Sequence, residues 1–155
     1  MIYGTDYHVG RDDDWEDIVS ERVGAEISGH EWVNVNGVTF DLKHHLGGST
    51  IPHGRYTAIS RDALWNLVWA SDGRQPQADI ILRAHVHYFV YAGDEKKLGI
   101  VMPALQGYGS KYGIRRCSGT VSIGLLSFDV EDDGRYSWEP HLLDSALLRI
   151  KPKRG

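Results

Sequence analysis

Apolar residues recur along this chain with two different periods, which predict a mixture of helices and strands. Residues 15–23 carry apolar side chains at helical spacing, and the pair Asp13 and Glu16 has the form of a capping box. We therefore expect a short amphipathic helix that ends at Gly24. The same spacing over residues 52–71 predicts a longer helix.

Strand signals occupy most of the remaining chain. Apolar and polar residues alternate over 31–43 on both sides of Asn36-Gly37, the strongest short hairpin signal. Residues 80–82 are apolar at consecutive positions, which is typical of a strand covered on both faces. We expect an α/β fold with a mixed sheet and antiparallel C-terminal strands. The later strands are expected at 88–92, 98–103, 119–130 and 135–138.

Length and composition favour a single domain. The chain has 155 residues, 41% of them hydrophobic, and we expect one domain over 1–145 followed by a basic tail at 146–155. A formal net charge of -4 means that any anion site must be local. Cys117 is the one cysteine, which excludes an internal disulfide framework. With no apolar run of membrane-spanning length, the predicted compartment is the cytoplasm, and no membrane partner is expected.

Histidines follow two of the predicted strands. His85 and His87 come after residues 80–82, and an extended backbone would place both rings on the same side. His44 and His45 follow the second strand of the hairpin. Because ligand sites of α/β sheets gather beyond the carboxyl ends of strands, these histidines are candidates for one metal site. A short His-x-His pattern has an equally simple explanation, hydrogen bonding in a partly buried strand.

The remaining histidines divide into two groups. His8 lies in the loop after a short strand predicted at residues 1–3 and is a further candidate for the site. His30, His53 and His141 lie in unpatterned stretches, so we expect them to be surface or capping residues.

The order of these elements over residues 1–140 resembles the C-terminal half of the calcineurin-like metallophosphoesterases, in particular phage and prophage members. The matching motifs are "LKHHLGG" and "RAHVH", in which Ala84 replaces a glycine, together with the divergent loop "YGTDYHVG". The resemblance implies a metallophosphoesterase-type α/β sandwich that binds two divalent ions, with manganese, zinc and iron left open. It implies His44 as a metal ligand, with His45 as the alternative.

Further roles follow from the same resemblance. His85 would bind one metal ion and His87 the other, Asp6 would supply an oxygen ligand, and His8 would act as general acid. The loop after the His-x-His strand carries Lys111, Arg115 and Arg116, which either bind substrate phosphate or form a solvated basic loop.

The family's N-terminal half, with its bridging carboxylate, has no counterpart in this sequence. We therefore expect the chain to assemble with an N-terminal half chain or to self-associate as a homo-oligomer, leaving part of the apolar sheet uncovered when alone. The apolar residues concerned are Ile80, Ile81, Leu82 and Val101.

The expected function is that of a metal-dependent phosphoesterase, a hydrolase for which a phosphodiester is the favoured substrate and nucleic acid one source of it. The alternative is a degenerate, non-catalytic domain of the same type that binds a partner chain or nucleic acid. A metal titration with and without a partner chain would separate the two.

Overall fold

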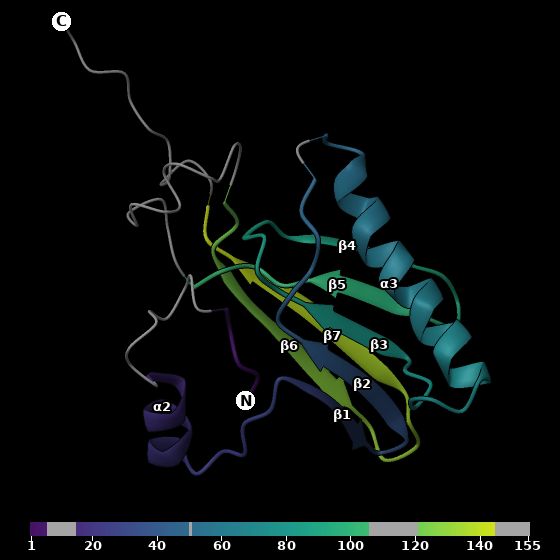
Figure 1. The fold of residues 1–155 in the computed structure, drawn as a ribbon, viewed down its shortest axis with the longest axis horizontal. Helices are drawn as coiled ribbons and strands as arrows, with labels where there is room; N and C mark the ends of the chain where they lie inside the picture. The colour runs from purple at the N-terminus through teal and green to yellow at the C-terminus, as the bar shows by residue number, and fades with distance from the viewer. Residues whose placement is uncertain (6–14, 50, 106–120, 145–155) are drawn as a thin grey trace, which may run out of the picture.

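A computed structural model describes residues 1–5, 15–49, 51–105 and 121–144 of the chain. Helices and strands alternate through the first part of the chain, and strands alone follow (Figure 1). The elements are α2 (Trp15–Val23), β1 (His30–Val35), β2 (Val38–Lys43), α3 (Gly54–Ser71), β3 (Ile80–Arg83), β4 (Val90–Gly93), β5 (Leu98–Val101), β6 (Gly124–Val130) and β7 (Tyr136–Leu142).

The sheet is mixed, as the sequence predicts. Its strands lie in the order β1-β2-β3-β5-β4, and β6 and β7 form a separate antiparallel pair. The two pairings at the centre, β2 with β3 and β3 with β5, are parallel, whereas the edge strands β1 and β4 pair antiparallel. The expected α/β class with antiparallel C-terminal strands is confirmed.

The turn at Asn36-Gly37 joins β1 to β2. Val35 and Val38 are directly paired, and the two turn residues have φ values of 48° and 90°. Positive φ at both central positions matches the right-handed twist of the flanking strands, and Asn followed by Gly tolerates it best. The predicted hairpin is therefore confirmed.

Both faces of the sheet are covered within the chain. α3 lies across one face (Figure 1), where Ile81 and Val101 join a core cluster with Ile59 of the helix. Alternate residues point to the other face, where Ile80 and Phe40 pack near Phe128 of β6. Figure 1 shows the β6–β7 hairpin running along this sheet.

The expected exposure of the central strands is therefore wrong. Ile80, Ile81 and Val101 are each 0% exposed. Leu82 is partly buried against the second cluster. The physical reason is that α3 covers one face and the β6–β7 hairpin covers the other, so no additional chain is needed to shield these residues.

The helices turn unexpected faces inward. In α2 the buried residue is Ser20, and the apolar residues at helical spacing are exposed: Trp15, Ile18, Val19 and Val23. In α3 the buried residues are Ala58, Ile59 and Asn66, whereas Leu64, Leu67 and Val68 are exposed. Asn66 of α3 also makes polar contacts, which are described below. No helix within the described residues is long and apolar enough to cross a membrane.

Candidate functional site

The carboxyl ends of β2 and β3 bring two histidine-bearing segments together. His44 directly follows β2, and His85 lies two residues beyond β3. The N–H of Ala84 donates a hydrogen bond to the carbonyl oxygen of His44 at 2.9 Å, which extends the contact between these parallel strands past their ends. Parallel pairing therefore positions both histidines at one edge of the sheet.

The two imidazole rings are in direct contact. His85 Nδ1 lies 3.3 Å from His44 Nε2, and the ring centroids are 5.3 Å apart at an interplanar angle of 73°. The His45 and His85 rings are tilted relative to each other, with centroids 4.9 Å apart and an interplanar angle of 32°. His44 thus presents a ring nitrogen to His85, whereas His45 makes only a tilted ring contact with it.

The backbone at His85 differs from the expected strand. His85 and His87 have φ values of 74° and 58°, in the left-handed region, and β3 ends at Arg83. The N–H of Val86 donates to the carbonyl oxygen of Ala84 at 2.9 Å, which closes a three-residue turn around His85. The expectation that residues 85–87 are extended is wrong. A non-glycine residue with positive φ costs roughly 1–2 kcal/mol, and such strain clusters at functional sites.

His87 lies in a partly buried environment. Burial lowers the pKa of its imidazole below the ordinary value, which favours the neutral ring that can bind a cation. Its carbonyl oxygen accepts a hydrogen bond from the N–H of Ser122 at 2.9 Å, and this contact fixes the segment that follows the turn.

A carboxylate that the sequence does not predict at this site lies across Gly4 from His44. Glu16 Oε1 accepts a hydrogen bond from the N–H of Gly4 at 2.6 Å. A Cβ atom built on Gly4 would lie 2.8 Å from Glu16 Oε1 and 3.7 Å from His44 Cε1, so both groups border the same small volume. The sequence indicates Glu16 only as part of a capping box, and no local pattern pairs it with His44.

The histidine pair fits one edge of a metal site. Zinc binds imidazole nitrogens at about 2.0–2.1 Å, so two tetrahedral ligands stand roughly 3.3–3.4 Å apart, and the His44–His85 nitrogens are 3.3 Å apart. A carboxylate such as Glu16 adds the oxygen that harder cations prefer. Within the described ranges, however, no group of three or more His, Cys, Asp or Glu side chains is arranged to hold a metal ion.

Several of the expected site residues lie outside the described residues. These are Asp6, His8, Lys111, Arg115 and Arg116. The assignment of His44, His85 and His87 as metal ligands stays a prediction.

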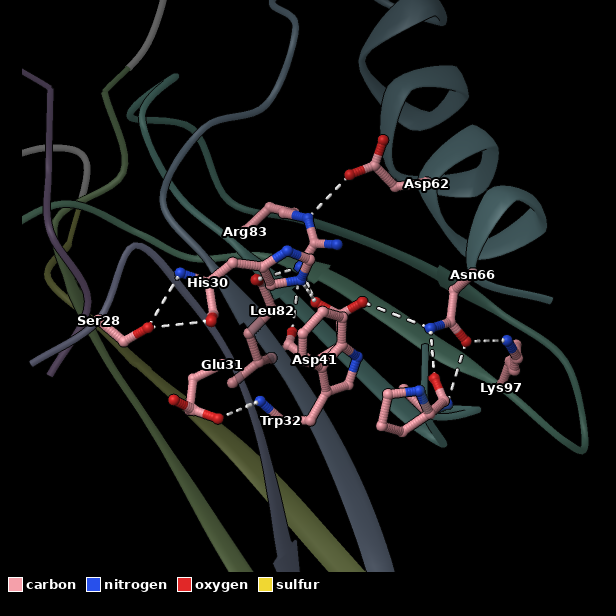
Figure 2. Close-up of polar contacts among 12 residues, drawn as sticks. Ser28, His30, Glu31, Trp32, Asp41, Asp62, Asn66, Leu82, Arg83 and Lys97 are labelled. Atoms are coloured by element: carbon pink, nitrogen blue, oxygen red, sulfur yellow. Dashed lines mark hydrogen bonds and ion pairs between the residues drawn. The ribbon is translucent and has the colours of Figure 1, made fainter. Parts of the chain in front are cut away.

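A buried ion pair lies beneath the strand ends (Figure 2). Arg83 Nη1 is 2.8 Å from Asp41 Oδ1, and these side chains are only 4% and 1% exposed. Arg83 Nε also binds Asp62 of α3 at 2.8 Å. His30 Nε2 lies 2.8 Å from the same Asp41 oxygen. His30 is 30% exposed, as expected of a residue at the surface, but its ring also contacts this buried carboxylate, which the sequence does not predict.

Asn66 extends this network along α3 (Figure 2). Its Oδ1 accepts hydrogen bonds from Lys97 Nζ at 2.7 Å and from the N–H of Ala78 at 3.0 Å. Burial lowers the pKa of the Lys97 amine, and the negative charges of Asp41, Asp79 and Asp94 partly oppose this effect. The network therefore ties α3 to the strands that end at the histidine pair.

Comparisons with known proteins find similarity of structure only. Neither a protein-family model nor a curated protein matches the chain. Among solved structures, wild-type Vps29 complexed with Zn²⁺ from Entamoeba histolytica has a TM-score of 0.46 at 17% identity, covering 82% of this chain and 75% of that one. A single mutant of the same Vps29 has a TM-score of 0.44 at 15% identity, covering 76% and 62%.

A third similar structure is the solution NMR structure of Thermotoga maritima protein TM1076. It has a TM-score of 0.41 at 18% identity over 86% of this chain. This chain spans 62% of the length of TM1076 and of the Vps29 mutant.

Proposed function

We propose that this chain is a metal-dependent phosphoesterase of the calcineurin-like type, for which a phosphodiester is the favoured substrate. One observation carries the proposal: His44 Nε2 and His85 Nδ1 lie 3.3 Å apart at the carboxyl edge of a parallel strand pair. The left-handed φ of His85 supports it, because local strain is retained most often where it positions a functional side chain.

The chain's own residues divide the chemistry between them. His44 and His85 would hold a divalent cation, with His87 and Asp6 as the further ligands that the family resemblance implies and the Glu16 carboxylate as a nearby negative charge. A bound divalent cation would lower the pKa of water and polarise the phosphoryl oxygens. His8 would protonate the leaving alkoxide. The phosphodiester would be contacted by Lys111, Arg115 and Arg116. A second chain or a second copy of this chain would complete the metal site, which is weak in a single chain.

Hydrolysis of bis(p-nitrophenyl) phosphate with added Mn²⁺ or Zn²⁺ tests the proposal. We expect slow, metal-dependent turnover that His85→Ala removes. His141→Ala is the matched control, since His141 hydrogen-bonds Ser127 on the β6–β7 hairpin and has no part in the proposed site. Equal rates in the wild type and His85→Ala would contradict the proposal.

A second candidate function is that of a non-catalytic domain that binds a partner chain or nucleic acid. It is favoured by a specific observation: within the part of the chain that the structure describes, no third ligand completes a metal group with His44 and His85. In that case Zn²⁺ or Mn²⁺ would bind weakly, and no diester would be hydrolysed at any metal concentration. Turnover that depends on His85 would exclude this candidate.

A further inference from the structure

Two buried polar atoms without hydrogen-bond partners lie close together beside the histidine loop. Within the described residues, Arg55 Nε and Tyr88 Oη are both buried and both lack a partner. The Arg55 guanidinium carbon lies 4.6 Å from the centroid of the Tyr88 ring. The Ser49 backbone is near the Tyr88 hydroxyl, but outside hydrogen-bond geometry. Because buried polar groups nearly always have a partner, these two atoms are candidates to contact a bound ligand.

Arg55 also has no carboxylate partner among the described residues. Its guanidinium is always protonated, and a partly buried charge is costly unless a counter-charge accompanies it. The Tyr88 side chain is 6% exposed, and its hydroxyl can donate a hydrogen bond to an anion.

The start of α3 adds to the positive character of this corner. Arg55 is in the first turn of α3, which contains no acidic residue, and the N-cap residue His53 makes no side-chain capping hydrogen bond. The N–H groups at a helix N-terminus carry partial positive charge and favour an anion.

This corner adjoins the histidine pair. Tyr88 directly follows His87, and the loop that begins at His44 leads into α3. The two segments touch, since a Cβ atom on Gly48 would lie 3.4 Å from Val86 Cγ1. The corner around Arg55 and Tyr88 is therefore contiguous with the segment that carries His85 and His87.

We propose that Arg55, the Tyr88 hydroxyl and the first turn of α3 form an anion site that receives a phosphoryl group. This anion site would position the substrate by contacting the non-reacting phosphoryl oxygens. That the anion is part of a phosphoester rests on the proposed function. Anion binding itself needs no metal, so it can be tested separately from hydrolysis.

The test is titration of the metal-free chain, in EDTA, with inorganic phosphate by isothermal titration calorimetry. Arg55→Gln should bind phosphate about tenfold more weakly or worse, because it loses a charge-assisted hydrogen bond to the anion. Tyr88→Phe should weaken binding less, and Arg55→Lys should restore part of it. Arg74→Gln is the matched control and should bind as the wild type does, because Arg74 also lies over an aromatic ring, that of Trp69, at 5.2 Å.

Two results would overturn the inference: phosphate binding that Arg55→Gln leaves unchanged, or no binding by the folded wild type at millimolar phosphate. Thermal unfolding of each variant shows that it is folded before titration. Phosphate binding that depends on Arg55 without any hydrolysis would support the anion site and count against the proposed enzyme. Metal-dependent hydrolysis with a KM that Arg55→Gln leaves unchanged would support the proposed enzyme and count against the anion site.

Discussion

His44 Nε2 lies 3.3 Å from His85 Nδ1, although the two residues are 41 positions apart in the sequence. The parallel pairing of β2 with β3 produces this contact, because it brings the carboxyl ends of both strands to one edge. The hydrogen bond from the Ala84 N–H to the His44 carbonyl then holds the two segments together beyond the strands.

His85 has a φ of 74°, so we expect that replacing it with glycine keeps the fold stable but weakens metal binding. A left-handed φ costs a non-glycine residue about 1–2 kcal/mol, whereas glycine loses roughly 0.5–1 kcal/mol of chain entropy. His85→Gly should therefore be at least as stable as the wild type in EDTA, by urea unfolding, yet lose Zn²⁺ affinity.

His141→Gly is the control for this prediction. His141 is in β7 and has no positive φ, so glycine there should cost about 0.5–1 kcal/mol. A loss of stability in His85→Gly larger than that in His141→Gly would show that the turn stores no strain.

Removal of Arg83 should strongly destabilise the fold. Arg83→Met leaves the 1% exposed Asp41 without its arginine partner, and breaking a buried ion pair typically costs about 3–5 kcal/mol. Urea denaturation measures the effect. Arg135→Met is the control: Arg135 pairs with Glu131 and Asp133 on the surface and should cost no more than about 1 kcal/mol. Similar losses in both variants would contradict the importance of the buried network.

The lowered pKa of Lys97 predicts a pH dependence. Between that pKa and the usual value of about 10.4, the unfolded chain binds more protons than the folded chain, so the free energy of unfolding rises with pH. Lys97→Met lacks this contribution. The wild type should therefore gain stability relative to Lys97→Met as the pH rises toward the usual lysine pKa of about 10.4. Lys96→Met, at the adjacent exposed position, is the control, and a constant difference for Lys97→Met would exclude the effect.

Glu16→Gln should weaken metal binding without disturbing the N-terminal segment. The amide keeps an oxygen that can accept the hydrogen bond from Gly4, but it removes the negative charge near His44. We expect Zn²⁺ affinity to fall by about tenfold or more, as for other groups that support metal ligands. Glu31→Gln changes an exposed carboxylate that contacts the N–H of Trp32, and it should have no effect. Equal affinity in both variants would place Glu16 outside the site.

Local patterns in the sequence predict much of this fold. The Asn36-Gly37 turn and the apolar run that contains Ile80 and Ile81 depend on neighbouring residues alone, and both are confirmed. The positions of His44 and His85 beyond strand ends are predicted in the same way. Their proximity also follows, because parallel neighbouring strands end at one edge.

The remaining features depend on contacts between distant residues. The inward face of α3 combines Ile59, which apolar spacing predicts, with Asn66, whose partners Lys97 and Ala78 lie in other segments, so apolar spacing alone does not predict the polar part of this face. The turn at His85 and the approach of Glu16 to His44 likewise arise from tertiary packing. No periodicity in the sequence encodes them.

The central claim is that His44 and His85 hold a divalent cation through the two nitrogens that face each other. Long-range ¹H–¹⁵N NMR spectra of the imidazole rings, recorded while Zn²⁺ is added, observe these atoms directly. The account predicts that His44 Nε2 and His85 Nδ1 shift together, as coordinated nitrogens do, and that His141 stays unchanged. Zinc binding that leaves these two nitrogens unshifted, or no binding at all, would contradict it.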